Sequence, residues 1–196
     1  PAPSECEECV HFADVSLNSE ISTIMELDRE AQKQGKIHSV ILLFDLGDLR
    51  EGFFYEDDIL NAVGEVIRLK NINLLGIGTS LSCYGGILPT TENLGRLVEI
   101  KKHIEKKYRI KLKVVSGGSS TSYSLVRAGT IPEGINNLRI GDTIYIGRDD
   151  STREHIEELY DDCFVLECEV IEVKEKPSVP IGVSGYASLN RKPVFE

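Results

Sequence analysis

The sequence predicts an α/β fold built from repeated strand–helix units. Short apolar runs alternate with amphipathic segments between residues 14 and 140. Several of these runs are continuously apolar, which is typical of strands buried on both faces of a parallel sheet. Polar, glycine-rich loops follow the strands, at the edge where parallel sheets bind their ligands.

Two units occupy the first part of the chain. Residues 14–17 predict a short strand, and apolar residues at helical spacing predict a helix over 19–34, with Gly35 as its stop signal. The run 38–44 (HSVILLF) is continuously apolar after Ser39 and predicts a buried strand. A helix over 56–69 completes the second unit.

Two further units and a final strand follow. Residues 72–77 predict the third strand, and a helix is expected over 90–107. Residues 112–115 predict the fourth strand, which leads through a Gly/Ser loop into a short helix over 123–129. Residues 135–140 predict the fifth strand. Repeated units of this kind imply a parallel sheet with right-handed connections.

The pattern changes after Gly147. Residues 148–162 (RDDSTREHIEELYDD) predict a polar connecting helix. Residues 163–176 (CFVLECEVIEVKEK) alternate apolar and charged side chains, with a phase change at Ile171 that indicates a β-bulge in a half-exposed antiparallel strand. We therefore expect one domain over 1–150, and a connecting helix with the first strands of a β domain over 151–196.

Composition argues against several classes of partner. The 196 residues are 41% hydrophobic and 28% charged, as in ordinary globular proteins, and the formal net charge is -10. This charge argues against nucleic acid and anionic membranes as partners. No apolar run is long enough to span a bilayer, and no signal peptide is visible.

Cysteine usage predicts reduced thiols in a cytoplasmic protein. The chain has an odd number of cysteines, and they are scattered along it. Cys6 and Cys9 form a CxxC pair, but no second pair follows, so no metal site is predicted.

The stretch 114–122 (VVSGGSSTS) joins a strand to a helix through two glycines and several hydroxyls. Glycines let the backbone approach a ligand, amides at a helix N-terminus point outward, and serines add donors, so the stretch suits a phosphate. An ordinary loop capped by serine is the alternative. Polar loops at 45–52, 79–86 and 141–142 end neighbouring strands, so we expect one shared site.

The number of units leaves the architecture open. A TIM barrel needs eight strand–helix units, and five cannot close one. The sheet is therefore either open, or the last part of a barrel whose first three strands precede Pro1.

Four motifs in register resemble the alanine racemase family, which depends on pyridoxal 5'-phosphate (PLP), and are closest to its ornithine racemase branch. They are DLGDLREG (45–52), GIGTSLSCYGG (76–86), SGGSSTS (116–122) and INNLRIGDTIYIG (135–147). The resemblance implies a partial PLP-binding TIM (β/α)8 barrel, strands 4–8, over residues 1–150, followed by the start of a C-terminal β domain. The lysine that binds PLP covalently would lie outside this chain, and the fragment alone would be inactive.

The resemblance also implies roles for residues of the loops. Ser119 corresponds to the family's phosphate-binding serine, with Gly118 and Ser120 beside it. Gly141 and Asp142 correspond to the phosphate contacts after the last barrel strand. The full-length form would be a cytoplasmic homodimer that binds a small-molecule amino acid.

Two arginines correspond to functional residues of the family. Arg139 matches an arginine that faces the pyridine nitrogen, and Arg50 matches one near the cofactor phenolate and the substrate. Arginine only donates hydrogen bonds and stays charged, which leaves the ring nitrogen unprotonated and suits racemisation. An ordinary ion pair is the alternative for each. Ser80 stands where many relatives place a histidine over the ring, and Tyr186 lies near the position of the family's second base, without matching spacing.

The acidic residues around Arg50 predict a cationic substrate such as ornithine or another diamino acid. Alanine-specific relatives tend to have uncharged residues there, because buried carboxylates need a partner. Asp45, closest to the strand end, is expected to orient the loop, so Asp48 is the candidate partner of the distal ammonium. The alternative is that these acids are solvated, or that they merely neutralise Arg50.

Two other functions fit parts of the pattern. A non-catalytic PLP-binding homeostasis protein would share the barrel but lack the β domain, so the strand expected after residue 160 favours the racemase. A TIM-barrel enzyme acting on a phosphorylated substrate would share only the phosphate loop.

Overall fold

In the computed structural model, residues 1–186 and 194 are described. The chain divides into two compact units, Pro1–Phe164 and Val165–Glu196. The first unit contains all the described helices and strands, and the second is treated by itself below.

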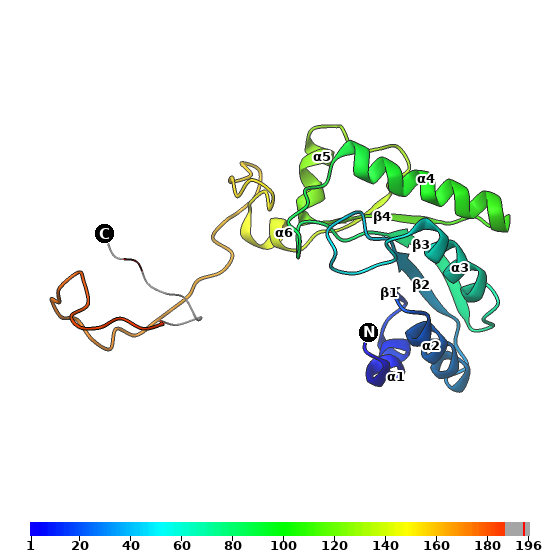
Figure 1. The fold of residues 1–196 in the computed structure, drawn as a ribbon, viewed down its shortest axis with the longest axis horizontal. Coiled ribbons are helices and arrows are strands. Elements are labelled where there is room, and N and C mark those ends of the chain that lie inside the picture. Colours follow the sequence, from blue (N-terminus) through cyan, green and yellow to red (C-terminus); the bar gives the residue numbers. More distant parts are fainter. Residues whose placement is uncertain (187–193, 195–196) are drawn as a thin grey trace. The chain divides into compact units, whose positions relative to one another are not determined.

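Five parallel strands form the sheet of the first unit, in the order β1-β2-β3-β4-β5. Their bounds are Val15–Asn18 (β1), His38–Leu43 (β2), Ile72–Gly78 (β3), Val114–Ser119 (β4) and Asn137–Arg139 (β5). Because sequential strands are neighbours and every pair is parallel, all crossovers turn the same way, and α2, α3 and α4 cover one face of a curled sheet (Figure 1). A doubly wound sheet would instead reverse its strand order. The predicted α/β class is confirmed, as half of a barrel.

The helices follow the strands along the chain in the order expected from the sequence. Their bounds are Cys6–Phe12 (α1), Ile21–Lys33 (α2), Glu56–Val66 (α3), Thr91–Tyr108 (α4), Tyr123–Arg127 (α5) and Asp142–Ile146 (α6), with 3-10 turns at Pro3–Glu5 and Ser120–Ser122. The helices α2 to α5 confirm the predicted ones. The short α1 and α6 were not predicted, because so few residues show no clear periodicity. None of the described helices is both long and apolar enough to cross a bilayer.

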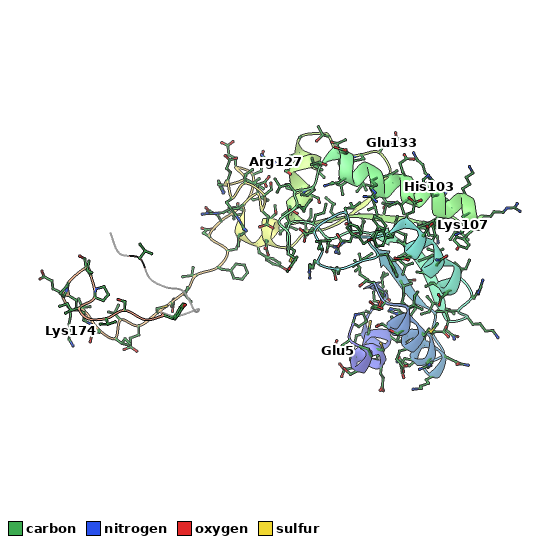
Figure 2. All side chains as sticks on the ribbon, viewed as in Figure 1. Glu5, His103, Lys107, Arg127, Glu133 and Lys174 are labelled. Atoms are coloured by element: carbon green, nitrogen blue, oxygen red, sulfur yellow. The ribbon has the colours of Figure 1, made fainter. Side chains whose placement is uncertain are left out.

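Helix α4 shows why the longer predictions succeed. The Thr90 hydroxyl accepts the Asn93 N–H at 3.1 Å, and the Asn93 side chain accepts the Thr90 N–H at 2.8 Å, which forms a capping box. Leu97 and other apolar residues pack inward, while polar side chains such as those of His103 and Lys107 are exposed (Figure 2).

Strand β2 is buried on both faces, as predicted. Val40 and Leu42 belong to the apolar core that the helices share, whereas Ile41 and Leu43 lie on the opposite face, and none of the four is more than 6% exposed. Glycines bring β3 close to β4: a Cβ at Gly76 would overlap the Val114 carbonyl, with which it pairs in register.

Strand β4 runs through the glycines instead of ending before them. The strand predicted over 112–115 begins at Val114 and continues to Ser119. Its register against β5 shifts between Ser116 and Ser119, where Gly118 has a φ of 107°. The glycine therefore bends the strand at a backbone conformation that other residues rarely adopt, a feature that apolar periodicity does not reveal.

The polar helix predicted over 148–162 is wrong. The segment folds into turns, because the Asp149 carboxylate accepts the N–H groups of Ser151 at 2.9 Å and Thr152 at 3.3 Å. Arg153 then adopts a positive φ of 65°. Such local side-chain-to-backbone bonds compete with the helix.

The strand predicted over 163–176 is also not observed. Within the described residues this segment has no regular secondary structure, and Val165, Leu166 and Ile171 are exposed. A strand with one apolar face needs a paired neighbour, and the described part of the second unit offers none. That a β domain begins here stays a prediction.

Candidate functional site

A cleft of about 550 Å³ opens at the carboxyl ends of the strands. Its volume lies within the range of small-molecule sites. The loops predicted to meet do so here, and the lining residues are Leu17, Leu43, Arg50, Glu51, Ser80, Leu81, Ser82, Cys83, Ser119, Arg139, Asp142, Asp150 and Arg153. A smaller cavity of about 240 Å³ lies at the opposite, amino-terminal ends of β1 and β2, between His11 and His38.

Arg139 is anchored at the end of β5. Its Nη1 donates to Ser116 Oγ at 2.6 Å, and its Nη2 donates to the Thr79 carbonyl at 3.0 Å and to Ser80 Oγ at 3.3 Å. Burial lowers the pKa of Arg139, and the nearby Glu51 carboxylate opposes that shift. An arginine nevertheless stays charged, so Arg139 gives the cleft a permanent positive charge at a position fixed by its hydrogen bonds.

A chain of polar contacts links Arg139 to Arg50. Ser80 Oγ accepts from Arg139 and donates to Glu51 Oε1 at 2.9 Å. Glu51 Oε1 also lies 3.5 Å from Arg50 Nη1. Ser80, which stands where many relatives place a histidine over the cofactor ring, therefore bridges a cation and an anion. The ion pair expected as the alternative role of Arg50 is present, and its partner is Glu51.

Asp45 orients its own loop, as predicted. Its Oδ1 accepts the N–H of Gly47 at 2.8 Å and that of Leu49 at 3.2 Å. These bonds hold the loop that carries Arg50 toward the cleft.

Asp48 is fully buried and fastens this loop to the next one. Its carboxylate accepts the N–H groups of Cys83 at 3.2 Å, Tyr84 at 2.8 Å and Ile87 at 3.0 Å. Burial alone would raise the pKa of Asp48, but the hydrogen bonds outweigh it and lower the pKa. This geometry argues against the predicted role of Asp48 as the partner of a substrate ammonium.

Hydroxyls of the Gly/Ser stretch lie beside the start of α6. Ser120 Oγ accepts the N–H groups of Gly141 at 3.1 Å and Thr143 at 3.4 Å, and Ser119 Oγ is 3.3 Å from Thr121 Oγ1. Ser120 Oγ thus accepts hydrogen bonds from N–H groups that could otherwise donate to a bound anion. The buried Thr143 Oγ1 has no hydrogen-bond partner within the described residues.

The remaining predicted residues differ in their placement. Asp142 lines the cleft as the first residue of α6. Tyr186 is 76% exposed in the second unit, and its role stays a prediction. Sequence reasoning missed Asp150 and Arg153, an ion pair of 2.7 Å in the turn after α6. The Asp and Ser residues of that turn were the available signal.

Known proteins resemble this chain in sequence. Residues 1–149 match the family model described as alanine racemase, N-terminal domain. The chain is 43% identical over 196 residues to the ornithine racemase of Acetoanaerobium sticklandii, covering all of this chain and 56% of that protein. It is 40% identical over 195 residues to the lysine racemase of Thermotoga maritima, covering all of this chain and 54% of that protein. The chain spans about half the length of the curated relatives it matches.

Solved structures resemble the fold. An alanine racemase of Clostridium difficile 630 in complex with cycloserine has a TM-score of 0.58 at 17% identity, covering 81% of this chain and 43% of that one. PipY of Synechococcus elongatus PCC7942 with PLP bound has a TM-score of 0.57 at 16% identity, covering 72% of this chain and 65% of that one. At these identities the likeness concerns the fold alone, in which five strands match part of a TIM barrel.

Proposed function

Because this chain belongs to the family of the alanine racemase N-terminal domain, we propose that it is the cofactor-binding part of a PLP-dependent racemase acting on ornithine or another diamino acid. One observation carries the proposal. Arg139 and Arg50 are linked through Ser80 and Glu51 in a cleft at the ligand-binding edge of the sheet. The curated relatives act on ornithine and on lysine, which both carry a distal ammonium.

The donor set of the cleft fits PLP. The hydroxyls of Ser119, Ser120 and Thr143 would donate to the phosphate, and Gly118 lets the backbone approach it. The Gly141 amide, which donates to Ser120 Oγ in this structure, would exchange that hydrogen bond for one to the phosphate. When bound, PLP draws electrons from the substrate α-carbon and so acidifies its proton. No lysine lines the cleft in the described part of the chain. The proposal therefore assigns covalent attachment to the half of the relatives that this chain does not cover.

The two arginines would divide the remaining work. Arg139, held by three hydrogen bonds, would donate toward the ring nitrogen without giving up its own proton, because a guanidinium stays charged. Arg50 has a half-exposed side chain, and its guanidinium suits the substrate carboxylate and the cofactor phenolate.

The proposal extends to the whole protein. Residues 1–150 would form part of the barrel, and 151–196 the connection to a C-terminal β domain that includes Tyr186. The active form would be a cytoplasmic homodimer, and the net charge of the present chain argues against nucleic acid and membrane partners.

Racemisation assays on the whole protein loaded with PLP test this function. We expect a visible absorbance band of bound PLP, and racemisation of L-ornithine or L-lysine at least about 10-fold faster than that of L-alanine. Racemisation of alanine at an equal or higher rate would contradict a diamino-acid substrate. Failure to racemise any of the three would contradict the function itself.

A further inference from the structure

Three acidic residues line the cleft and two more belong to one of its loops, and most of the five already have partners. Asp45 and Asp48 accept backbone N–H groups of their own and the neighbouring loop. Asp150 pairs with Arg153 at 2.7 Å. Asp142 is exposed and is the first residue of α6. It lies beside the proposed phosphate site, where the two negative charges would repel each other. Glu51 remains as the acid available to a ligand cation.

Glu51 has one oxygen held and one oxygen free. The Ser80 hydrogen bond at 2.9 Å and the Arg50 approach at 3.5 Å both involve Oε1. Oε2 has no hydrogen bond or ion pair with any other described residue. The Arg50 distance is longer than the usual charge-assisted hydrogen bond of about 2.7–2.9 Å, so this pair is loose. Ser80 thus positions the carboxylate of a residue that lines the cleft, and its second oxygen is left without a partner among the described residues.

The charges of the cleft make this oxygen useful. Arg50, Arg139 and Arg153 line it together with Glu51, Asp142 and Asp150, so the cations and anions balance. A phosphate and a substrate carboxylate would add negative charge, and the carboxylate would occupy Arg50. A distal ammonium then needs an anion of its own, because an unpaired charge is costly to desolvate.

We propose that Glu51 selects the substrate side chain, its free carboxylate oxygen pairing with the distal ammonium of a diamino acid while Ser80 holds the other oxygen. The inference rests on the proposed racemase function, since it names what the same cleft recognises. It assigns to Glu51 the role that the sequence suggested for Asp48.

The test compares two substrates of equal length. L-Norleucine carries a methyl group where L-ornithine carries its ammonium. In the whole protein loaded with PLP, Glu51→Gln keeps the shape and the Ser80 contact but removes the charge. We expect kcat/KM for ornithine to fall about 10-fold more than that for norleucine, because any effect through Arg50 is common to both substrates. Glu65→Gln, which removes an exposed carboxylate from α3, should change neither.

Norleucine turnover also reports whether the variant is folded, and Glu51→Asp should recover part of the ornithine preference. Equal losses on both substrates would overturn the inference, because Glu51 would then only position Arg50. The inference would also be overturned if Glu51→Gln changed kcat/KM for neither substrate. It would be overturned as well if Asp142→Asn, and not Glu51→Gln, removed the preference for ornithine.

A binding measurement separates this inference from the racemase function. By calorimetry, wild-type protein should bind ornithine more tightly than norleucine, and Glu51→Gln should abolish the difference. This result supports the role of Glu51 even if no racemisation is detected. A preference that survives Glu51→Gln overturns the role even if racemisation is rapid.

Discussion

Asp48 and Glu51 lie in the same loop, yet their surroundings assign them opposite roles. The Asp48 carboxylate accepts three backbone N–H groups from residues beyond β3, whereas Glu51 lines the cleft and binds Ser80 through one oxygen. A carboxylate that accepts several amide hydrogen bonds fixes backbone geometry, and one that faces a cleft remains available to a cation.

Asp48→Asn tests the structural role. The asparagine amide would set its own donors against backbone N–H groups, so we expect a loss of about 1.5–3 kcal/mol in the free energy of unfolding, measured with urea at pH 7. Asp57→Asn, an exposed change in the first turn of α3, should cost less than about 1 kcal/mol. Turnover of ornithine and norleucine should fall together, because both loops that line the cleft loosen.

The acid dependence of this loss follows from the lowered pKa of Asp48. The folded state holds the ionised form, so the stabilisation is fully present above the ordinary aspartate pKa of about 3.9. It is lost as the pH falls through the lower folded-state pKa. The difference between wild type and Asp48→Asn should therefore shrink below pH 4 and stay constant between pH 5 and 7, and a difference that grows on acidification would contradict this account.

At the scale of elements, close packing between β3 and β4 positions a residue that anchors Arg139 of the cleft. Gly76 faces Val114 with no room for a side chain, and Gly78 places Ser116 at the edge where Arg139 binds it. Ser116 Oγ therefore depends on glycines in another strand for its position. Arg139 is thus held by β4 and by the loop that follows β3.

A pair of glycine substitutions tests this packing. Gly76→Ala should destabilise the protein by more than about 3 kcal/mol or prevent soluble expression, because its Cβ would meet the Val114 carbonyl. Gly95→Ala in α4 has nothing within 4 Å of its Cβ and should stabilise by about 0.5–1 kcal/mol. Thermal unfolding measures both, and a tolerated Gly76→Ala would show that the strands can separate.

At the scale of the whole molecule, the described sheet has two open edges. Within the described residues, β1 and β5 each pair on one side only. Open edges present unpaired N–H and C=O groups that favour pairing with another chain. We therefore expect the half-barrel to self-associate when it is produced by itself.

Size-exclusion chromatography with light scattering on the 196-residue chain checks this expectation. We expect a mass that rises with concentration. Val15→Lys, which puts a charge on an exposed position of β1, should weaken the association. A monomeric mass at all concentrations, for wild type and variant alike, would show that the edges are protected.

Much of the fold was predictable because its signals are local. Strand β2 is a continuous apolar run, and α4 carries its amphipathic spacing and its capping residues within its own sequence. The motifs at 45–52, 76–86, 116–122 and 135–147 indicated the family for the same reason. The helix predicted over 148–162 was wrong, because a turn centred on Asp149 replaces it. The strand predicted over 163–176 is not observed within the described residues, which offer it no partner strand, and the β domain stays a prediction.

The sequence by itself determined the α/β class, the order of strands and helices, the family, and which loops end at the ligand edge. Only the tertiary structure decided which acid holds a loop and which faces the cleft. Asp48 meets its amide donors 35 to 39 positions along the chain, and Ser80 meets Glu51 across 29. Hydrogen bonds between segments so far apart depend on how the strands align in the sheet, and no local pattern of residues specifies that alignment.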